Sequence, residues 1–290
     1  MTGRIALQLA LSGLSVGSIY AIVALSLAIP FKASRVLNFA QGELVTLGAY
    51  IALVLTSYGL PYAVMVSATL LIAAAFGLLI ERLVIRPIVD APEFTLVIAT
   101  FALGLIIRAL IRIHWQDNVY FLPAPYAGAA FAIGPLRVNP SYLVIIGTTA
   151  VLVALLVLFF ARTKLGKAMR AVSFNPIAAR LMGIRVSTVF GSAWALSAAI
   201  GALAGLLLAP VIGINPELGH LIIKALVAAV IGGFGSLGGA LFGGLLLGVL
   251  ETYAGAMFGA AFKEIIPFAI LIAILLVRPQ GLWGATHARV

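Results

Sequence analysis

Long apolar runs constrain the fold of this chain more than any other feature. Several reach the roughly 20 apolar residues that a helix needs to cross a bilayer, and none alternates polar and apolar residues as barrel strands do. The runs cover residues 5–29, 37–57, 61–80, 94–111, 141–160, 187–213, 221–233, 239–257 and 265–277. The sequence therefore predicts an all-α polytopic membrane protein with roughly 8–10 transmembrane helices, and we interpret 221–233 as half of a broken helix.

The composition excludes several other classes of protein. Charged residues make up only 9% of the chain, against about 25% in soluble domains, so we expect one transmembrane domain over residues 1–290. A net charge of +10 would suggest nucleic acid in a soluble protein. Here the basic residues lie largely in loops beside apolar runs, which the positive-inside rule explains, so no nucleic-acid partner is expected. The absence of cysteine excludes disulfides and thiol chemistry.

The loop at 161–186 sets the predicted topology. It contains no acidic residue and six basic ones: Arg162, Lys164, Lys167, Arg170, Arg180 and Arg185. The positive-inside rule places it in the cytoplasm. Counting outward, 31–36 (with Lys32 and Arg35), 81–93 and the C-terminal tail with Arg278 and Arg289 are cytoplasmic, whereas 113–140 and 214–220 lie outside. The run at 5–29 is too long for a signal peptide and is interpreted as a retained anchor helix.

Glycine spacing predicts close helix packing. Small residues four apart allow helix backbones to approach in lipid, and this spacing occurs at Gly13 and Gly17, at Gly201 and Gly205, and in a set near the C-terminus: Gly235, Gly239, Gly243, Gly244 and Gly248. Packing within the chain and packing at a subunit interface both remain open. The segment 231–240, IGGFGSLGGA, is too rich in glycine for an uninterrupted helix.

Two short segments form a weak internal repeat and supply the candidate pathway residues. The first, at 38–44, and the second, at 215–221, both place an asparagine four residues before a glycine. Opposite predicted orientations suggest an inverted repeat with a pathway at its interface, although chance similarity is an alternative. The candidates are Asn38, Gln41, Gly42, Glu43, Asn215, Gly219 and Lys224.

Three ionisable residues lie nearest the interior of the predicted spans: Glu43, Lys224 and Glu251. Such residues often mark a pathway. Glu43 is expected about seven residues inside its span, whereas snorkelling from a helix end is the alternative for Lys224 and Glu251.

Signatures of catalysis or cofactor binding are missing from the sequence. It contains no G-x-x-x-x-G-K-[ST] phosphate loop and no H-E-x-x-H. His114, His220 and His287 are scattered without metal-ligand spacing. We therefore expect no enzyme activity, no metal and no cofactor in this chain.

Several motifs in the sequence resemble a known family. Residues 176–184, PIAARLMGI, resemble the cytoplasmic "EAA" signature of ABC-importer permeases: Ala178, Ala179 and Gly183 match, whereas Ile177 occupies the glutamate position. Other stretches, in order, are similar to the shorter subunit of branched-chain amino-acid permeases. They are 17–21 (GSIYA), 38–43 (NFAQGE), 81–87 (ERLVIRP), 232–239 (GGFGSLGG) and 278–282 (RPQGL).

The resemblance implies a permease domain in the bacterial inner membrane that moves leucine, isoleucine, valine or related small amino acids and amides. It also implies a second permease subunit, two cytoplasmic ATPase subunits that bind ATP and magnesium, and a periplasmic solute-binding protein. The rival hypotheses are an ATP-independent secondary transporter or channel, which predicts several ion-coupling acids within the spans, and a membrane-embedded enzyme, which needs a catalytic cluster.

The resemblance also gives the basic loop a second role, as the element that couples the permease to its ATPases. From about residue 175 to 183 we expect a short helix with Asn175 as N-cap, Pro176 in the first turn and Gly183 ending it in the left-handed conformation. The predicted coupling residues are Asn175, Pro176, Ile177, Ala178, Ala179, Arg180 and Gly183. The alternative is that the loop is only a topology signal.

Overall fold

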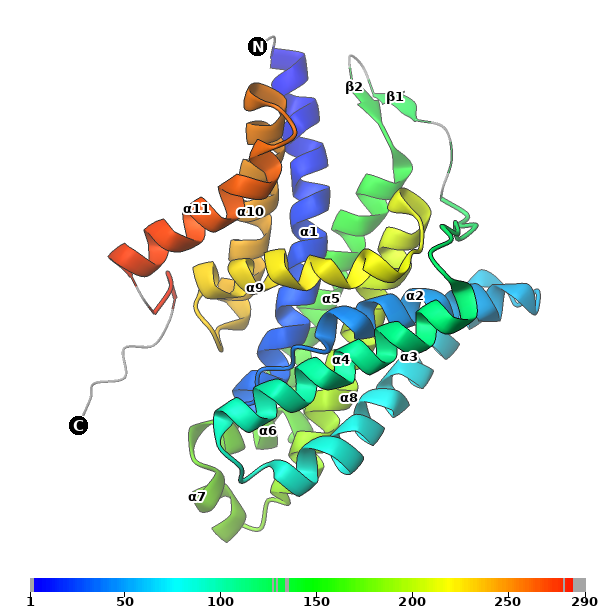
Figure 1. Ribbon diagram of the computed structural model, residues 1–290. Helices are drawn as coiled ribbons and strands as arrows, with labels where there is room; N and C mark the ends of the chain where they lie inside the picture. The colour runs from blue at the N-terminus through cyan, green and yellow to red at the C-terminus, as the bar shows by residue number, and fades with distance from the viewer. Residues whose placement is uncertain (1–2, 127, 129, 134–135, 279, 284–290) are drawn as a thin grey trace. The chain divides into compact units, whose positions relative to one another are not determined.

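The computed structural model describes residues 3–126, 128, 130–133, 136–278 and 280–283 and is almost entirely helical (Figure 1). The all-α prediction is confirmed. Within the described ranges the only strands are β1 (Phe131–Ile133) and β2 (Leu136–Val138), which pair as an antiparallel hairpin. Arg289 and Pro279, which the topology and motif predictions included, lie outside the described residues.

Six helices are long and apolar enough to cross a membrane. They are α1 (Gly3–Ser34), α3 (Tyr62–Ile80) with its continuation to Ile88, α4 (Glu93–Trp115), α5 (Pro140–Arg162), α8 (Val186–Ile212) and α10 (Leu237–Phe258). Shorter apolar helices are α2 (Gln41–Ser57), α9 (Leu221–Gly232) and α11 (Phe262–Val277). Together they correspond one to one with the nine predicted runs.

Several predicted boundaries were wrong. α1 extends to Ser34, so Lys32 lies in a helix rather than in a loop. α2 begins at Gln41, four residues later than the apolar run, because Asn38 Oδ1 accepts the backbone N–H of Ala40 and forms a turn there. The basic loop contains an unpredicted helix, α6 (Lys164–Phe174), before α7 (Pro176–Leu181).

The chain divides into two compact units, each built from distant parts of the sequence. Unit 1 comprises Met1–Ala28, Pro123–Thr149 and His220–Val290; unit 2 comprises Ile29–Leu122 and Ala150–Gly219. Whether both belong to one permease domain, as the sequence suggests, stays a prediction.

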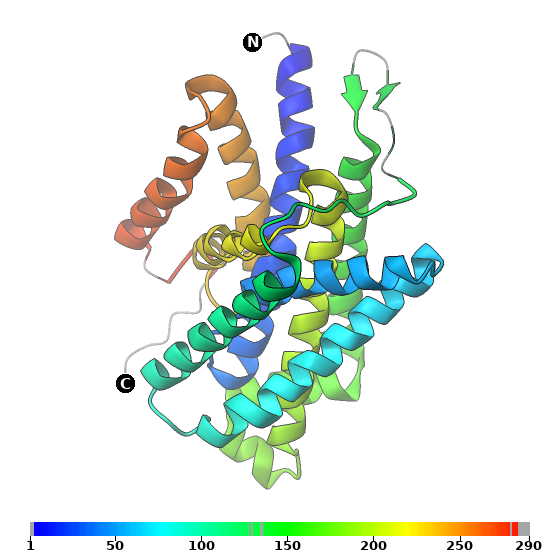
Figure 2. The ribbon, with the colours of Figure 1, turned by 45° about the vertical axis from the view of Figure 1, so that its right-hand side comes forward.

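In unit 2, α8 packs against α2 and α3 (Figure 2). The contacts are made backbone to backbone: Gly48 lies against Ala202, and Gly77 lies against the Trp194 carbonyl. A side chain at either glycine would collide with the facing helix. The predicted packing role of the pair Gly201 and Gly205 is also confirmed, since Gly205 lies against the Val45 carbonyl.

In unit 1, glycines hold α10 against both α1 and α9 (Figure 1). Gly244 and Gly248 face Ala21 and Gly17 of α1. Gly243 faces the Ala228 carbonyl of α9, and Gly239 faces Gly232. Packing within the chain is therefore confirmed for these four predicted glycines.

Gly235 is the exception in the predicted packing set. It lies in the break between α9 and α10, with φ +90° and open space where a Cβ would stand. Its role is conformational, because L-residues rarely adopt this backbone geometry. The break itself was predicted from the glycine-rich sequence. Ser236 Oγ accepts the Gly239 N–H at 3.1 Å and caps the new helix.

Neighbouring glycines on α10 provide a matched test of this packing. Gly239→Ala would drive a methyl group into the Gly232 backbone, and we expect a loss of about 1–3 kcal/mol or more in the free energy of unfolding. Gly238→Ala meets no atom within 4 Å and should leave stability unchanged or slightly raised. Unfolding of the detergent-solubilised protein measures both, and equal stabilities would contradict the packing described.

Candidate translocation and coupling sites

A buried polar network fixes the start of α2 in unit 2. Asn38 Nδ2 donates to Gln41 Oε1 at 3.1 Å, and Ser197 Oγ of α8 donates to the same oxygen at 2.9 Å. Gln41 Nε2 returns a bond to the Ser197 carbonyl at 3.1 Å. Asn38, Gln41 and Ser197 are fully buried. The network therefore ties the first candidate pathway segment to a membrane-spanning helix.

Glu43 lies next to this network and is paired with Arg108 of α4. Arg108 Nε donates to Glu43 Oε1 at 3.0 Å, and the guanidinium Nη2 contacts the same oxygen. Glu43 is 5% exposed. It stands in the first turn of α2 rather than seven residues inside the span, because the helix begins later than predicted. Both charges are held within the protein, where a buried ion needs a partner.

The second pathway segment meets the first at this ion pair. A Cβ on Gly219 would stand 2.5 Å from Glu43 Oε1, so the carboxylate occupies the space that a larger residue would fill. Gly219 lies in the short helix Pro216–His220, and Asn215 Oδ1 accepts the Glu217 N–H just before it. Asn38, Gln41, Gly42, Glu43 and Gly219 are therefore gathered in unit 2, with Asn215 four residues from the contact.

Sequence reasoning missed Arg108. The signal was present, since an arginine stood inside the predicted run 94–111, and intramembrane charges are rare and usually paired.

Lys224 belongs to a separate ion-pair network in unit 1. Its ammonium donates to Glu251 Oε1 and to Glu264 Oε1, each at 2.9 Å. Tyr20 OH donates to Glu251 Oε2 at 2.8 Å. The network joins α1, α9, α10 and α11, and Glu251 is buried. These contacts favour an internal salt-bridge network over snorkelling for Lys224 and Glu251.

Parts of two loops predicted on the outer side, residues 113–122 and 214–219, lie side by side in unit 2. Arg112 bonds both Asp117, at 3.0 Å, and Glu217. Tyr120 and Ile214 exchange backbone hydrogen bonds at 3.0 and 2.6 Å. The adjacency agrees with the prediction that residues 113–140 and 214–220 share one side.

The predicted short helix in the basic loop is confirmed. Asn175 Oδ1 accepts the N–H groups of Ile177 and Ala178 at 3.0 and 2.9 Å, and Pro176 occupies the first position of α7. Gly183 has φ +83°, and the Ile184 N–H reaches back to the Ala179 carbonyl at 3.0 Å. This is a glycine-terminated helix end of the kind expected from the sequence.

The two faces of α7 differ in exposure. Leu181 is 84% exposed, and Ile177 and Met182 are likewise exposed. Ala179 is buried at 4% exposure, so it faces its own chain. The expectation that Ala179 helps α7 to seat on another protein must be corrected: the apolar residues around it form the outward surface.

The basic loop also differs from the rest of the protein in its charge pairing. Among the described residues, none of its six cations has a carboxylate partner within 4.0 Å. Arg86, Arg108, Arg112 and Lys224 are each paired with acids. Within the described part of the chain, the loop therefore presents six cations without carboxylate partners beside an exposed apolar helix.

The fold and these sites define a multi-pass α-helical membrane protein, with charges paired within its helical units and a basic, partly helical loop exposed. Residues 9–275 match the family described as "Branched-chain amino acid transport system / permease component". The chain belongs to this family and is a permease component, not an enzyme.

Curated relatives match over nearly the full length. The high-affinity branched-chain amino acid transport system permease protein BraD of Pseudomonas aeruginosa is 33% identical, covering 96% of this chain and 95% of the relative. The corresponding protein LivH of Salmonella typhimurium is 30% identical with the same coverage. A probable branched-chain amino acid transport permease protein LivH of Methanocaldococcus jannaschii is 32% identical, covering 91% and 88%.

A double-mutant cycle tests the buried ion pair. We expect Glu43→Gln or Arg108→Gln alone to lower the free energy of unfolding by about 3–5 kcal/mol, because each leaves a buried charge unpaired. The double variant should lose much less than the sum, since no such charge remains. The exposed pair Arg112 and Glu217 is the control, with about 0–1 kcal/mol expected. Additive losses at Glu43 and Arg108 would show that the pair is not an energetic unit.

Proposed function

We propose that this chain forms part of the pathway of a bacterial inner-membrane ABC importer for leucine, isoleucine, valine or related small amino acids and amides. A second permease subunit completes the membrane part of the complex. A periplasmic solute-binding protein delivers the cargo, and two cytoplasmic ATPase subunits hold ATP and magnesium and drive transport. The chain itself carries no phosphate loop.

The observation that carries this proposal is the exposed helix α7. Ile177, Leu181 and Met182 present an apolar surface that has no reason to enter lipid, since Arg180 and Arg185 flank it. A groove on an ATPase subunit would cover these side chains. The helix is capped at both ends by its own residues, so it is preformed, and little ordering entropy opposes docking.

The pathway residues in this proposal are those around the Glu43–Arg108 pair of unit 2. The polar side chains of Asn38, Gln41 and Glu43 converge with Gly219 near the start of α2, just after the non-helical stretch that separates α1 from α2. Irregular backbone at membrane depth is tolerated where protein buries it or where it lines a cavity. Cargo released by a binding protein would pass such groups without requiring a tight site.

The orientation follows from charge. The basic loop and the C-terminus face the cytoplasm, and the loops joined by Arg112 face the periplasm.

Two substitutions, each in the first turn of a helix, test the coupling role. Ile177→Asp places a charge on the exposed surface of α7, in a first turn where an acid does not harm the helix. We expect ATPase-subunit binding to weaken at least about tenfold, as for an apolar interface anchor, and substrate-driven ATP turnover of the reconstituted complex to fall with it. The chain without ATPase subunits should show no turnover.

Thr188→Asp is the control for this experiment. It adds the same charge in the first turn of α8, also at an exposed position, and should leave binding and turnover near wild type. Wild-type binding and turnover in Ile177→Asp would show that α7 is not the docking element.

A further inference from the structure

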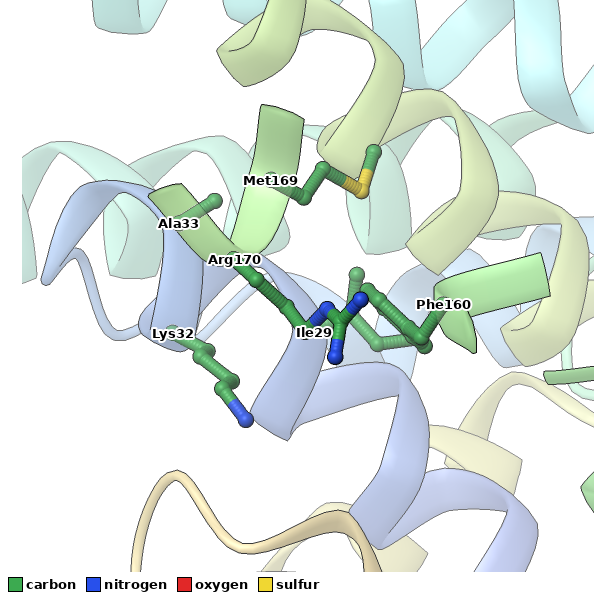
Figure 3. Close-up of a pocket in the computed structure, with 6 residues that line it drawn as sticks. All are labelled: Ile29, Lys32, Ala33, Phe160, Met169 and Arg170. Carbon is green, nitrogen blue, oxygen red and sulfur yellow. The ribbon is translucent and has the colours of Figure 1, made fainter. Parts of the chain in front are cut away.

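A small pocket in unit 2 lies where three helices end or begin. It is lined by Ile29, Lys32 and Ala33 from the last turns of α1, Phe160 from the last turn of α5, and Met169 and Arg170 from α6 (Figure 3). Helix ends that flank long apolar spans lie at the level of the lipid headgroups. The pocket therefore opens at the boundary between hydrocarbon and water.

The pocket wall is apolar with two cations. Ile29, Ala33, Phe160 and Met169 supply the apolar wall, and in Figure 3 the Arg170 side chain extends toward Phe160. The positive charges of Lys32 and Arg170 interact unfavourably with each other. Among the described residues the side chain of neither has a hydrogen-bonded or carboxylate partner. Two neighbouring cations without a counter-ion favour an anion between them.

The fold fixes the position of the helix that carries Arg170. Thr163 Oγ1 caps α6 by accepting the Gly166 N–H at 2.9 Å. Gly166 lies directly against the backbone of Phe159 and Phe160, where any side chain would collide. Met169 and Val172 are both buried and lie on the same side of α6. The helix is therefore fixed on the end of α5, and Arg170 cannot swing away with a loose loop.

The surroundings of the pocket favour a lipid over a free anion. Val157 lies three residues before Phe160 on α5, so the two share a helix face, and Val157 is exposed. An acyl chain leaving the pocket past Phe160 would continue along this apolar surface. A small soluble anion would bind to the two cations but would leave the apolar wall of the pocket exposed.

We propose that this pocket binds the phosphodiester headgroup of an anionic phospholipid between Lys32 and Arg170, with an acyl chain against Phe160 and α5. The lipid would join the cytoplasmic end of α1 to α6, the helix that precedes α7. The site is independent of any ATPase contact, so its test does not depend on the coupling role of α7.

The test is native mass spectrometry of the full chain in detergent, titrated with phosphatidylglycerol or with phosphatidylcholine. The wild type should retain one phosphatidylglycerol more tightly than any further copy, and more tightly than phosphatidylcholine. Lys32→Gln combined with Arg170→Gln should weaken that first binding about 30-fold, as expected when two interfacial cations are lost. Arg170→Gln alone, at an exposed position, should weaken it about fivefold.

Matched variants distinguish lipid binding in the pocket from a general attraction between positive surface charge and an anionic lipid. Lys164→Gln combined with Lys167→Gln removes the same charge from exposed positions on α6 and should change the affinity less than about twofold. Lys32→Arg combined with Arg170→Lys should retain the lipid. Equal losses in the pocket and control variants, or wild-type affinity in both pocket variants, would overturn the proposal. Displacement of the lipid by millimolar inorganic phosphate would also overturn it, because the site would then recognise a free anion.

Discussion

Leaving a charge unpaired in a low-dielectric environment costs free energy, and this cost determines which helices of the protein stay together. Six of its eight acidic residues form ion pairs with four basic residues: Glu43 with Arg108, Glu81 with Arg86, Asp117 and Glu217 with Arg112, and Glu251 and Glu264 with Lys224. A buried charge without such a partner destabilises the fold by several kcal/mol. The pairs therefore decide which helices must stay together: α2 with α4 in unit 2, and α9 with α10 and α11 in unit 1.

Close backbone packing complements these pairs. Lipid tails are as apolar as leucine, so apolar burial gives helices in a bilayer little reason to associate. Here Gly48, Gly77 and Gly205 bring α2, α3 and α8 together, and Gly239 and Gly243 do the same for α9 and α10. Dispersion contacts over such short separations are individually weak and collectively large. The glycines also leave the ion-pair residues where their partners can reach them, as Gly219 does for Glu43.

The sequence was informative where one physical rule acted locally. Apolar length predicted the nine apolar helices, glycine density predicted the break before α10, and Asn175, Pro176 and Gly183 predicted both ends of α7. Prediction from the sequence failed where a contact with a residue far away in the chain determined the structure. At the late start of α2, the local turn in which Asn38 accepts the Ala40 N–H is joined by the bond from Ser197, which lies 156 residues from Gln41. Arg108 was overlooked because its partner Glu43 is 65 residues away. No local pattern distinguishes Ala179, which faces inward, from its exposed neighbours, because that depends on how α7 lies on α6 and α8.

The six cations of the loop 161–186, none paired with a carboxylate among the described residues, predict a fixed orientation in the membrane, and this orientation underlies both proposed roles of the loop. The chain contains no cysteine, so single introduced cysteines can report the orientation of the chain in the membrane directly. With a membrane-impermeant maleimide, Ser173→Cys in the last turn of α6 should react only after cells are lysed, whereas Asn118→Cys, beside the Arg112 pairs, should react in intact cells once the outer membrane is permeabilised. Labelling of Ser173→Cys in such intact cells, with Asn118→Cys protected, would contradict the account.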